Sequence, residues 1–149
     1  MRASTPNTNE PVALSPRSLV IDVAPVAPYV ALIFYTGLIR LGRLPEVGFI
    51  ATDKLLHALV FGGLAVLCLR AQRSLLPQWS FGKHLAVALF ASSFVGAMLE
   101  VCQWFTSYRS ADVLDWLADT VGAVLVLGLW ALAFKVLAPR ALPPPAQGS

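Results

Sequence analysis

The chain has 149 residues, of which 57% are hydrophobic and 13% are charged, and its mean hydropathy is +0.70. A soluble domain usually has about 25% charged residues, so this composition indicates a single-domain integral membrane protein rather than a soluble one. The formal net charge is only +3, and the lysines and arginines stand singly between apolar runs. That pattern is typical of membrane flanks and argues against a nucleic-acid partner, which requires a clustered basic surface.

Four apolar runs predict four transmembrane helices. A span needs about 20 residues, and the last three runs are slightly short. They reach full length only if His57, Glu100 and Asp119 are taken into or near the membrane. In chain order the runs cover residues 23–39, 55–69, 85–99 and 120–134.

The predicted fold is therefore all-α, an integral membrane four-helix bundle over residues 21–138. Polar and proline-rich composition predicts disordered tails at residues 1–20 and 139–149. With the N-terminus inside, seven basic residues fall on the inner side and four on the outer side, which favours both termini in the cytoplasm. Cys68 and Cys102 fall near opposite faces of the bilayer and are predicted to be free thiols.

Polar side chains gather at the predicted outer ends of the second, third and fourth helices. Spacings of three and four residues place the members of each segment on one helical face, so three segments deliver polar groups to the same depth. The candidate site consists of Asp53, His57, Glu100, Gln103, Arg109, Asp112, Asp115 and Asp119.

Most of these residues also have a purely structural interpretation. Asp53 can cap the second helix, and Asp112 or Asp115 can cap the fourth, because carboxylates suit helix N-termini. Arg109 can be an ordinary interfacial charge or can pair with Asp112. His57 can be a neutral, hydrogen-bonded residue of the bundle.

Glu100 is the least easily explained by capping. It lies near the C-terminal end of its helix, where the helix dipole disfavours an anion. A charge at membrane depth costs several kcal/mol unless it is paired, and it usually faces the bundle interior or a cavity. The same helix places Ser92, Gly96, Glu100 and Gln103 on one stripe, as at a helix–helix interface. A structural interhelical hydrogen bond is the alternative.

The acidic residues outnumber the basic ones in this region. The region contains five carboxylates and two bases, Lys54 and Arg109, and the charge of His57 is left open. Some carboxylates must then be protonated, paired or bound to a cation. Oxygen ligands suit a divalent ion, but no spacing is that of a known metal-binding loop, so neither a metal nor another cofactor is expected.

The same residues carry a resemblance to a family. The segment 53–57, Asp-Lys-Leu-Leu-His, resembles the D-K-x-x-H motif of VanZ-like membrane proteins. Residues 100–103 are similar to their E-x-x-Q motif and residues 109–115 to their R-x-x-D-x-x-D motif. Residues 119–122 stand where the family often shows N-x-x-G, with Asp119 in place of the asparagine. The resemblance covers about residues 30 to 137.

The resemblance implies a small, multi-pass protein of the bacterial cytoplasmic (inner) membrane and cell envelope. The family takes its name from an accessory protein linked to resistance to the glycopeptide teicoplanin. Most members stand outside resistance clusters, so antibiotic resistance is not inferred for this chain.

Three functions remain open. In the first, the outer polar site binds an envelope lipid, a lipid-linked glycan or a lipophilic glycopeptide antibiotic. In the second, the chain is an enzyme acting on a lipid-linked substrate, with Glu100 and an aspartate as acid and base, Arg109 holding a phosphate or carboxylate, and His57 moving protons. No nucleophile motif accompanies them, which favours a non-enzymatic role. The third is a structural bundle or small transporter, and the oligomeric state is left open.

Overall fold

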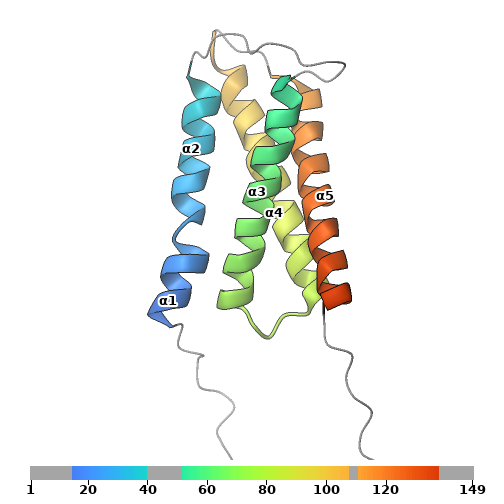
Figure 1. Cartoon of the computed structure of the whole chain (residues 1–149). Coiled ribbons are helices and arrows are strands. Elements are labelled where there is room, and N and C mark those ends of the chain that lie inside the picture. The colour runs from blue at the N-terminus through green and yellow to red at the C-terminus, as the bar shows by residue number, and fades with distance from the viewer. Residues whose placement is uncertain (1–14, 40–51, 108–110, 138–149) are drawn as a thin grey trace, which may run out of the picture.

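The structure, a computed structural model, describes residues 15–39, 52–107 and 111–137, and every regular element in these ranges is helical (Figure 1). Four stretches are long and apolar enough to cross a membrane, which confirms the predicted all-α, four-span membrane fold. The elements are α1 (Pro16–Ser18), the π-helix η1 (Leu19–Val23), α2 (Val26–Leu38), α3 (Thr52–Leu75), α4 (Phe81–Trp104) and α5 (Val113–Leu137).

The bundle has two chemically different ends. The beginning of α1 and the last turn of α5 lie at one end, which we call the terminal end, together with the turn between α3 and α4 (Figure 1). The opposite, distal end is formed by the last turns of α2 and α4 and the first turns of α3 and α5. Placement of the terminal end in the cytoplasm stays a prediction.

The helices extend beyond the apolar runs from which they were predicted. The second run ends at residue 69, yet α3 continues through Arg70 and Arg73 to Leu75. A charged residue ends a hydropathic run without ending a helix, because arginine is a good helix former. Such extensions give the last three spans 24, 24 and 25 residues, enough to cross the hydrocarbon core.

The N-terminal boundary at residue 20 needs correction, since the helix begins at Pro16. Ser15 caps it by accepting a hydrogen bond from the Ser18 backbone N–H at 3.1 Å, and proline suits the first helical position. The remaining predicted tail segments, residues 1–14 and 139–149, lie outside the described residues.

The first span is broken rather than continuous. The backbone N–H of Ala24 bonds to the carbonyl of Leu19 at 2.8 Å, five residues back, and α2 begins only at Val26. Pro25 and Pro28 have no N–H, so two bonds of a regular helical ladder are lost at this point. The predicted helix over residues 23–39 corresponds to α2, which begins three residues later, with Pro25 as its N-cap; the turn joins it to η1.

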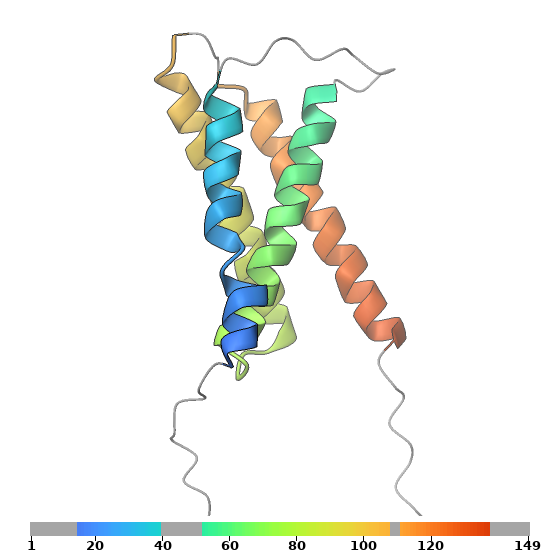
Figure 2. The same ribbon diagram turned by 60° about the vertical axis from the view of Figure 1, so that its left-hand side comes forward.

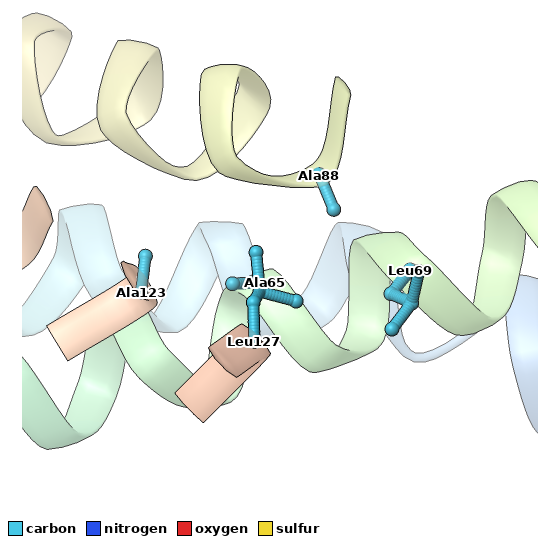
Figure 3. Packing of buried hydrophobic residues seen from close by; sticks show 5 residues of the cluster. All are labelled: Ala65, Leu69, Ala88, Ala123 and Leu127. Atoms are coloured by element: carbon cyan, nitrogen blue, oxygen red, sulfur yellow. The ribbon is translucent and has the colours of Figure 1, made fainter. Parts of the chain in front are cut away.

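Small residues bring α3, α4 and α5 together. Figure 3 shows the buried cluster between them, in which alanine methyl groups let the backbones approach. The closest approach lies nearby, where a Cβ at Gly122 would overlap the backbone of Ala58. Figure 2 shows α5 inclined to α3 and crossing it. The cluster consists of Ala65, Leu69, Ala88, Ala123 and Leu127.

A second apolar cluster joins α2 to α3 and α4. Ile33 of α2 packs with Phe61 and Leu64 of α3 and with Leu99 of α4. Each of these four side chains is buried, so this cluster holds the middle of α2 against α3 and α4. The two cysteines lie on α3 and α4 and are free thiols, as predicted.

Candidate functional site

Three helix ends place ionisable side chains at the distal end of the bundle. The first turns of α3 and α5 and the last turns of α4 meet there, so residues distant in sequence hydrogen-bond to one another. We call this group the distal cluster. It consists of Lys54, His57, Glu100, Asp112, Asp115 and Asp119.

His57 lies between two carboxylates of α5. Its Nδ1 is 2.9 Å from Oδ1 of Asp119, and its Nε2 is 4.0 Å from Oδ2 of Asp115. Asp119 is completely buried, and its Oδ2 has no hydrogen-bond partner among the described residues. A Cβ at position 96 would come within 2.6 Å of that oxygen, so Gly96 leaves the space that the carboxylate occupies.

Lys54 joins the two carboxylates that open α5. Its Nζ donates to Oδ2 of Asp112 at 3.0 Å and to Oδ1 of Asp115 at 2.6 Å. Asp112 also caps α5, accepting from the backbone N–H of Leu114 at 2.8 Å. That backbone hydrogen bond, followed by the bond from Lys54, lowers the pKa of the Asp112 carboxyl below its ordinary value. The capping interpretation of Asp112 is thus confirmed.

Glu100 connects α4 to the chain immediately before α5. Its Oε2 accepts a hydrogen bond of 2.7 Å from the backbone N–H of Asp112. Its Oε1 is buried and has no hydrogen-bond partner among the described residues. The structural hydrogen bond considered from sequence therefore exists, but it accounts for only one of the two carboxylate oxygens.

Two of the sequence candidates lie apart from this network, and a third falls outside the described residues. Gln103 is buried and donates from Nε2 to the backbone carbonyl of Gly37 at 3.0 Å, so it holds α4 to the end of α2. Asp53 is exposed and forms no hydrogen bond or ion pair within the described ranges. Arg109 lies outside the described residues, and its predicted roles stay predictions.

Sequence reasoning did not include Lys54 in the candidate site, although Lys54 contacts two of its aspartates. The available signal was its position three residues before His57, which places both on one face of α3. Asp53, four residues before His57, gave an equally good signal. Spacing alone could not choose between them.

Sequence reasoning also missed a group of hydrogen-bonded polar side chains between α4 and α5. The indole N–H of Trp116 donates to the Ser93 backbone carbonyl at 3.1 Å, and the Ser93 and Thr120 hydroxyls are 2.9 Å apart. Thr120 also donates to the backbone carbonyl of Trp116. These bonds fix the rotation of α5, and thereby the direction in which Asp119 points.

The distal cluster is rich in acceptors and poor in donors. It contains four carboxylates but only one lysine and one histidine. In the described part of the chain, no group of three or more His, Cys, Asp and Glu residues is arranged to hold a metal ion. No serine, threonine or cysteine there hydrogen-bonds to His57. The arrangement is suited to accepting hydrogen bonds from hydroxyl or amino groups of a ligand.

Comparison with known proteins identifies the family. The sequence profile of the VanZ/LLP1 family matches residues 3–134, which is most of the chain and includes all of the distal cluster. No match was found among curated proteins or among solved structures. The match and the four apolar helices make this a multi-pass membrane protein, and the chain belongs to the VanZ/LLP1 family.

Proposed function

We propose that the chain is a bacterial cytoplasmic-membrane protein whose distal cluster, on the outer side, binds the polar headgroup of an envelope lipid or lipid-linked glycan. A lipophilic glycopeptide antibiotic presents the same chemistry, an apolar tail joined to sugars. The observation that carries the proposal is the pair of buried carboxylate oxygens, Oε1 of Glu100 and Oδ2 of Asp119, that lack partners among the described residues.

An unpartnered buried acceptor is costly, typically about 1–3 kcal/mol and more for a charged group. A fold that needed these carboxylates only to join helices would gain by satisfying both oxygens of each. Sugar hydroxyls or a lipid amine would supply the missing donors. Each such hydrogen bond to a carboxylate would also be charge-assisted, and therefore stronger than a neutral one.

The surroundings of the cluster favour an amphipathic ligand. Leu55 and Leu56 on α3 are 49% and 48% exposed, and Leu114 and Leu117 on α5 are 56% and 45% exposed. In a membrane these side chains face lipid. A ligand whose headgroup reached the carboxylates would therefore lay its hydrocarbon tail against this leucine surface.

Photo-crosslinking tests the proposal. Protein in membrane vesicles would be incubated with three photoreactive probes: a polyprenyl-diphosphate-linked sugar, a lipoglycopeptide, and a phosphatidylcholine as the probe without headgroup donors. We expect selective labelling by at least one of the first two. The substitution Glu100→Gln should reduce that labelling about tenfold, the effect of losing one hydrogen bond to a charged group.

Asp53→Asn is the matched control, because Asp53 is an exposed carboxylate at the same bundle end and outside the network. It should leave labelling unchanged. Equal labelling of wild type and Glu100→Gln by all probes would refute the proposal, as would an equal loss in Glu100→Gln and Asp53→Asn.

A second candidate function is acid–base catalysis on a lipid-linked substrate. Its support is the contact of His57 with the buried Asp119, because a carboxylate that orients an imidazole is a common feature of catalytic bases. Mass spectrometry of the glycolipid probe after incubation tests this candidate. Catalysis predicts an altered probe with wild type and none with His57→Gln, and an unaltered probe with both proteins would contradict it.

A further inference from the structure

An apolar groove runs between the first span and α3, away from the distal cluster. Its α3 wall includes Gly63 and Val66, and its opposite wall includes Tyr29 and Leu32. The hydroxyl of Tyr29 donates to the Val60 carbonyl at 3.0 Å, so the one polar side-chain group in the groove is already satisfied. The complete lining is Pro25, Pro28, Tyr29, Leu32, Gly63, Val66 and Leu67.

The groove follows from two local features of the sequence. The turn at Ala24 and Pro25 divides the first span, and Gly63 has no side chain, so the Tyr29 ring can lie directly against α3 as the floor of the groove. A Cβ at position 63 would lie 2.7 Å from the Tyr29 hydroxyl oxygen. Both walls belong to membrane-spanning helices, where the surrounding solvent is hydrocarbon.

Arginine stands at the terminal end of the groove. Arg70 follows Val66 by four residues and Leu67 by three, so it extends the same face of α3. Its Nε and Nη2 donate to Oδ1 of Asp22 on η1 at 3.2 and 2.8 Å. The Arg70 side chain is still 39% exposed, and a guanidinium has five N–H donors, so it has donors left for a ligand.

The charge around this end of the groove is positive. Arg17 of α1 is exposed and Arg70 is paired with Asp22, so these three residues have a net charge of 2 − 1 = +1. Arg73 instead lies over the Phe134 ring of α5, 5.6 Å from its centroid. Each basic residue near a membrane surface contributes about 1 kcal/mol of attraction to anionic lipid. An apolar channel that ends at exposed arginine matches the shape of one molecule class, a hydrocarbon chain that carries a phosphate.

We infer that the groove between α2 and α3 holds one acyl chain of an anionic phospholipid, whose phosphate contacts Arg70 at the terminal end. The site is independent of the distal cluster, since it lies toward the opposite end of the bundle and shares no residue with it. A bound lipid there would fill the space between the broken first span and α3.

Native mass spectrometry of the full chain in detergent tests the inference. The protein would be equilibrated with equal amounts of phosphatidylglycerol and phosphatidylcholine carrying identical acyl chains. Both lipids carry a phosphate, but only phosphatidylglycerol is net anionic, because choline balances the phosphate charge in phosphatidylcholine. We therefore expect retained phosphatidylglycerol to exceed phosphatidylcholine about fivefold, as the attraction of one basic residue to a net anionic headgroup predicts. Leu32→Trp, which fills the groove, should abolish lipid retention of both kinds. Leu125→Trp is the matched control, because Leu125 is 60% exposed and Leu32 is 55% exposed, and it should behave as wild type.

Charge substitutions separate lipid contact from helix tethering. Asp22→Asn and Arg70→Gln both break the ion pair between η1 and α3. If Arg70 contacts phosphate, Asp22→Asn should raise the preference for phosphatidylglycerol and Arg70→Gln should reduce it to about one. A change in the same direction for both variants would overturn the inference. So would an unselective wild type, or equal retention in Leu32→Trp and Leu125→Trp.

Discussion

The two ends of the bundle use aspartate and glutamate differently. At the terminal end, Asp22 is fully engaged, with one oxygen bound to Arg70 and the other accepting from Ser74 at 2.8 Å. At the distal end, Glu100 and Asp119 each use one oxygen and leave the other buried without a partner among the described residues. Both ends join helices through carboxylates, but among the carboxylates of the described residues only Glu100 and Asp119 keep a buried oxygen without a partner. The unpartnered buried atoms at the terminal end, Gln72 Oε1 and His84 Nδ1, belong to an amide and an imidazole.

This difference indicates what a purely structural carboxylate looks like in this protein. The side chain of Asp22 is 24% exposed and has a cation and a hydroxyl as partners. Asp119 is 0% exposed and has one histidine as its partner. Burial with incomplete pairing costs free energy, so the distal carboxylates depart from the structural pattern of Asp22, and the proposed ligand would supply the missing partners.

The largest expected effect comes from Gly122, which keeps α5 close to α3 below the distal cluster. Gly122→Ala would place a Cβ on the backbone of Ala58 and force the two helices apart. We expect the free energy of unfolding to fall by about 3 kcal/mol or more, measured by denaturant titration in mixed micelles.

Gly128→Ala is the control for this substitution. It lies on the same helix, and nothing lies within 4 Å of a Cβ built there. Since alanine is the better helix former, this variant should be as stable as wild type or slightly more stable. Equal losses in the two variants would contradict the close approach of α3 and α5.

The next largest effect concerns the contact between His57 and Asp119. His57→Phe removes the one hydrogen-bond partner that Asp119 has among the described residues, which leaves a buried carboxylate unpaired. We expect a loss of about 2 kcal/mol in the free energy of unfolding. The double variant His57→Phe, Asp119→Leu should recover much of it, because two apolar groups replace the pair. Additive losses would show that the two side chains do not interact.

The smallest effect is a pH dependence at the start of α5. Asp112 has a pKa lowered by its bond from the Leu114 N–H and by Lys54. A carboxyl with a lowered folded-state pKa stabilises the fold above its ordinary pKa, and this contribution disappears as the pH falls through the lowered value. Melting temperatures should therefore favour wild type over Asp112→Asn at neutral pH and converge in acid. A gap that persists or widens in acid would contradict this assignment.

Much of the fold was predictable because lipid imposes simple rules on sequence. Backbone groups in hydrocarbon must be paired internally, so long apolar runs become helices. The helix boundaries were less accurate, since charged residues such as Arg70 end an apolar run while the helix continues. The prolines near the start of the first run do begin α2, with Pro25 at its N-cap. The helical residues 16–22 before that run were missed, because the polar residues there resemble a tail.

The meeting of three polar helix ends followed from topology alone, because alternating spans bring the ends of α2 and α4 beside the starts of α3 and α5. The topology did not determine which of these side chains contact one another. Lys54 and Asp53 are neighbours, yet one joins two aspartates and the other is exposed. That choice depends on the rotation of α3, which is set by the approach of Ala58 to Gly122. Pairwise packing of this kind leaves no periodic signal in a single sequence.

The most direct test of the account measures stability and ligand labelling on one variant, Glu100→Gln. The amide keeps an oxygen for the Asp112 N–H and removes a buried charge. We expect an unchanged or increased free energy of unfolding without ligand, together with about tenfold weaker labelling by the glycolipid or lipoglycopeptide probe. A loss of stability of about 2 kcal/mol with undiminished labelling would show that Glu100 serves the fold and would contradict the account.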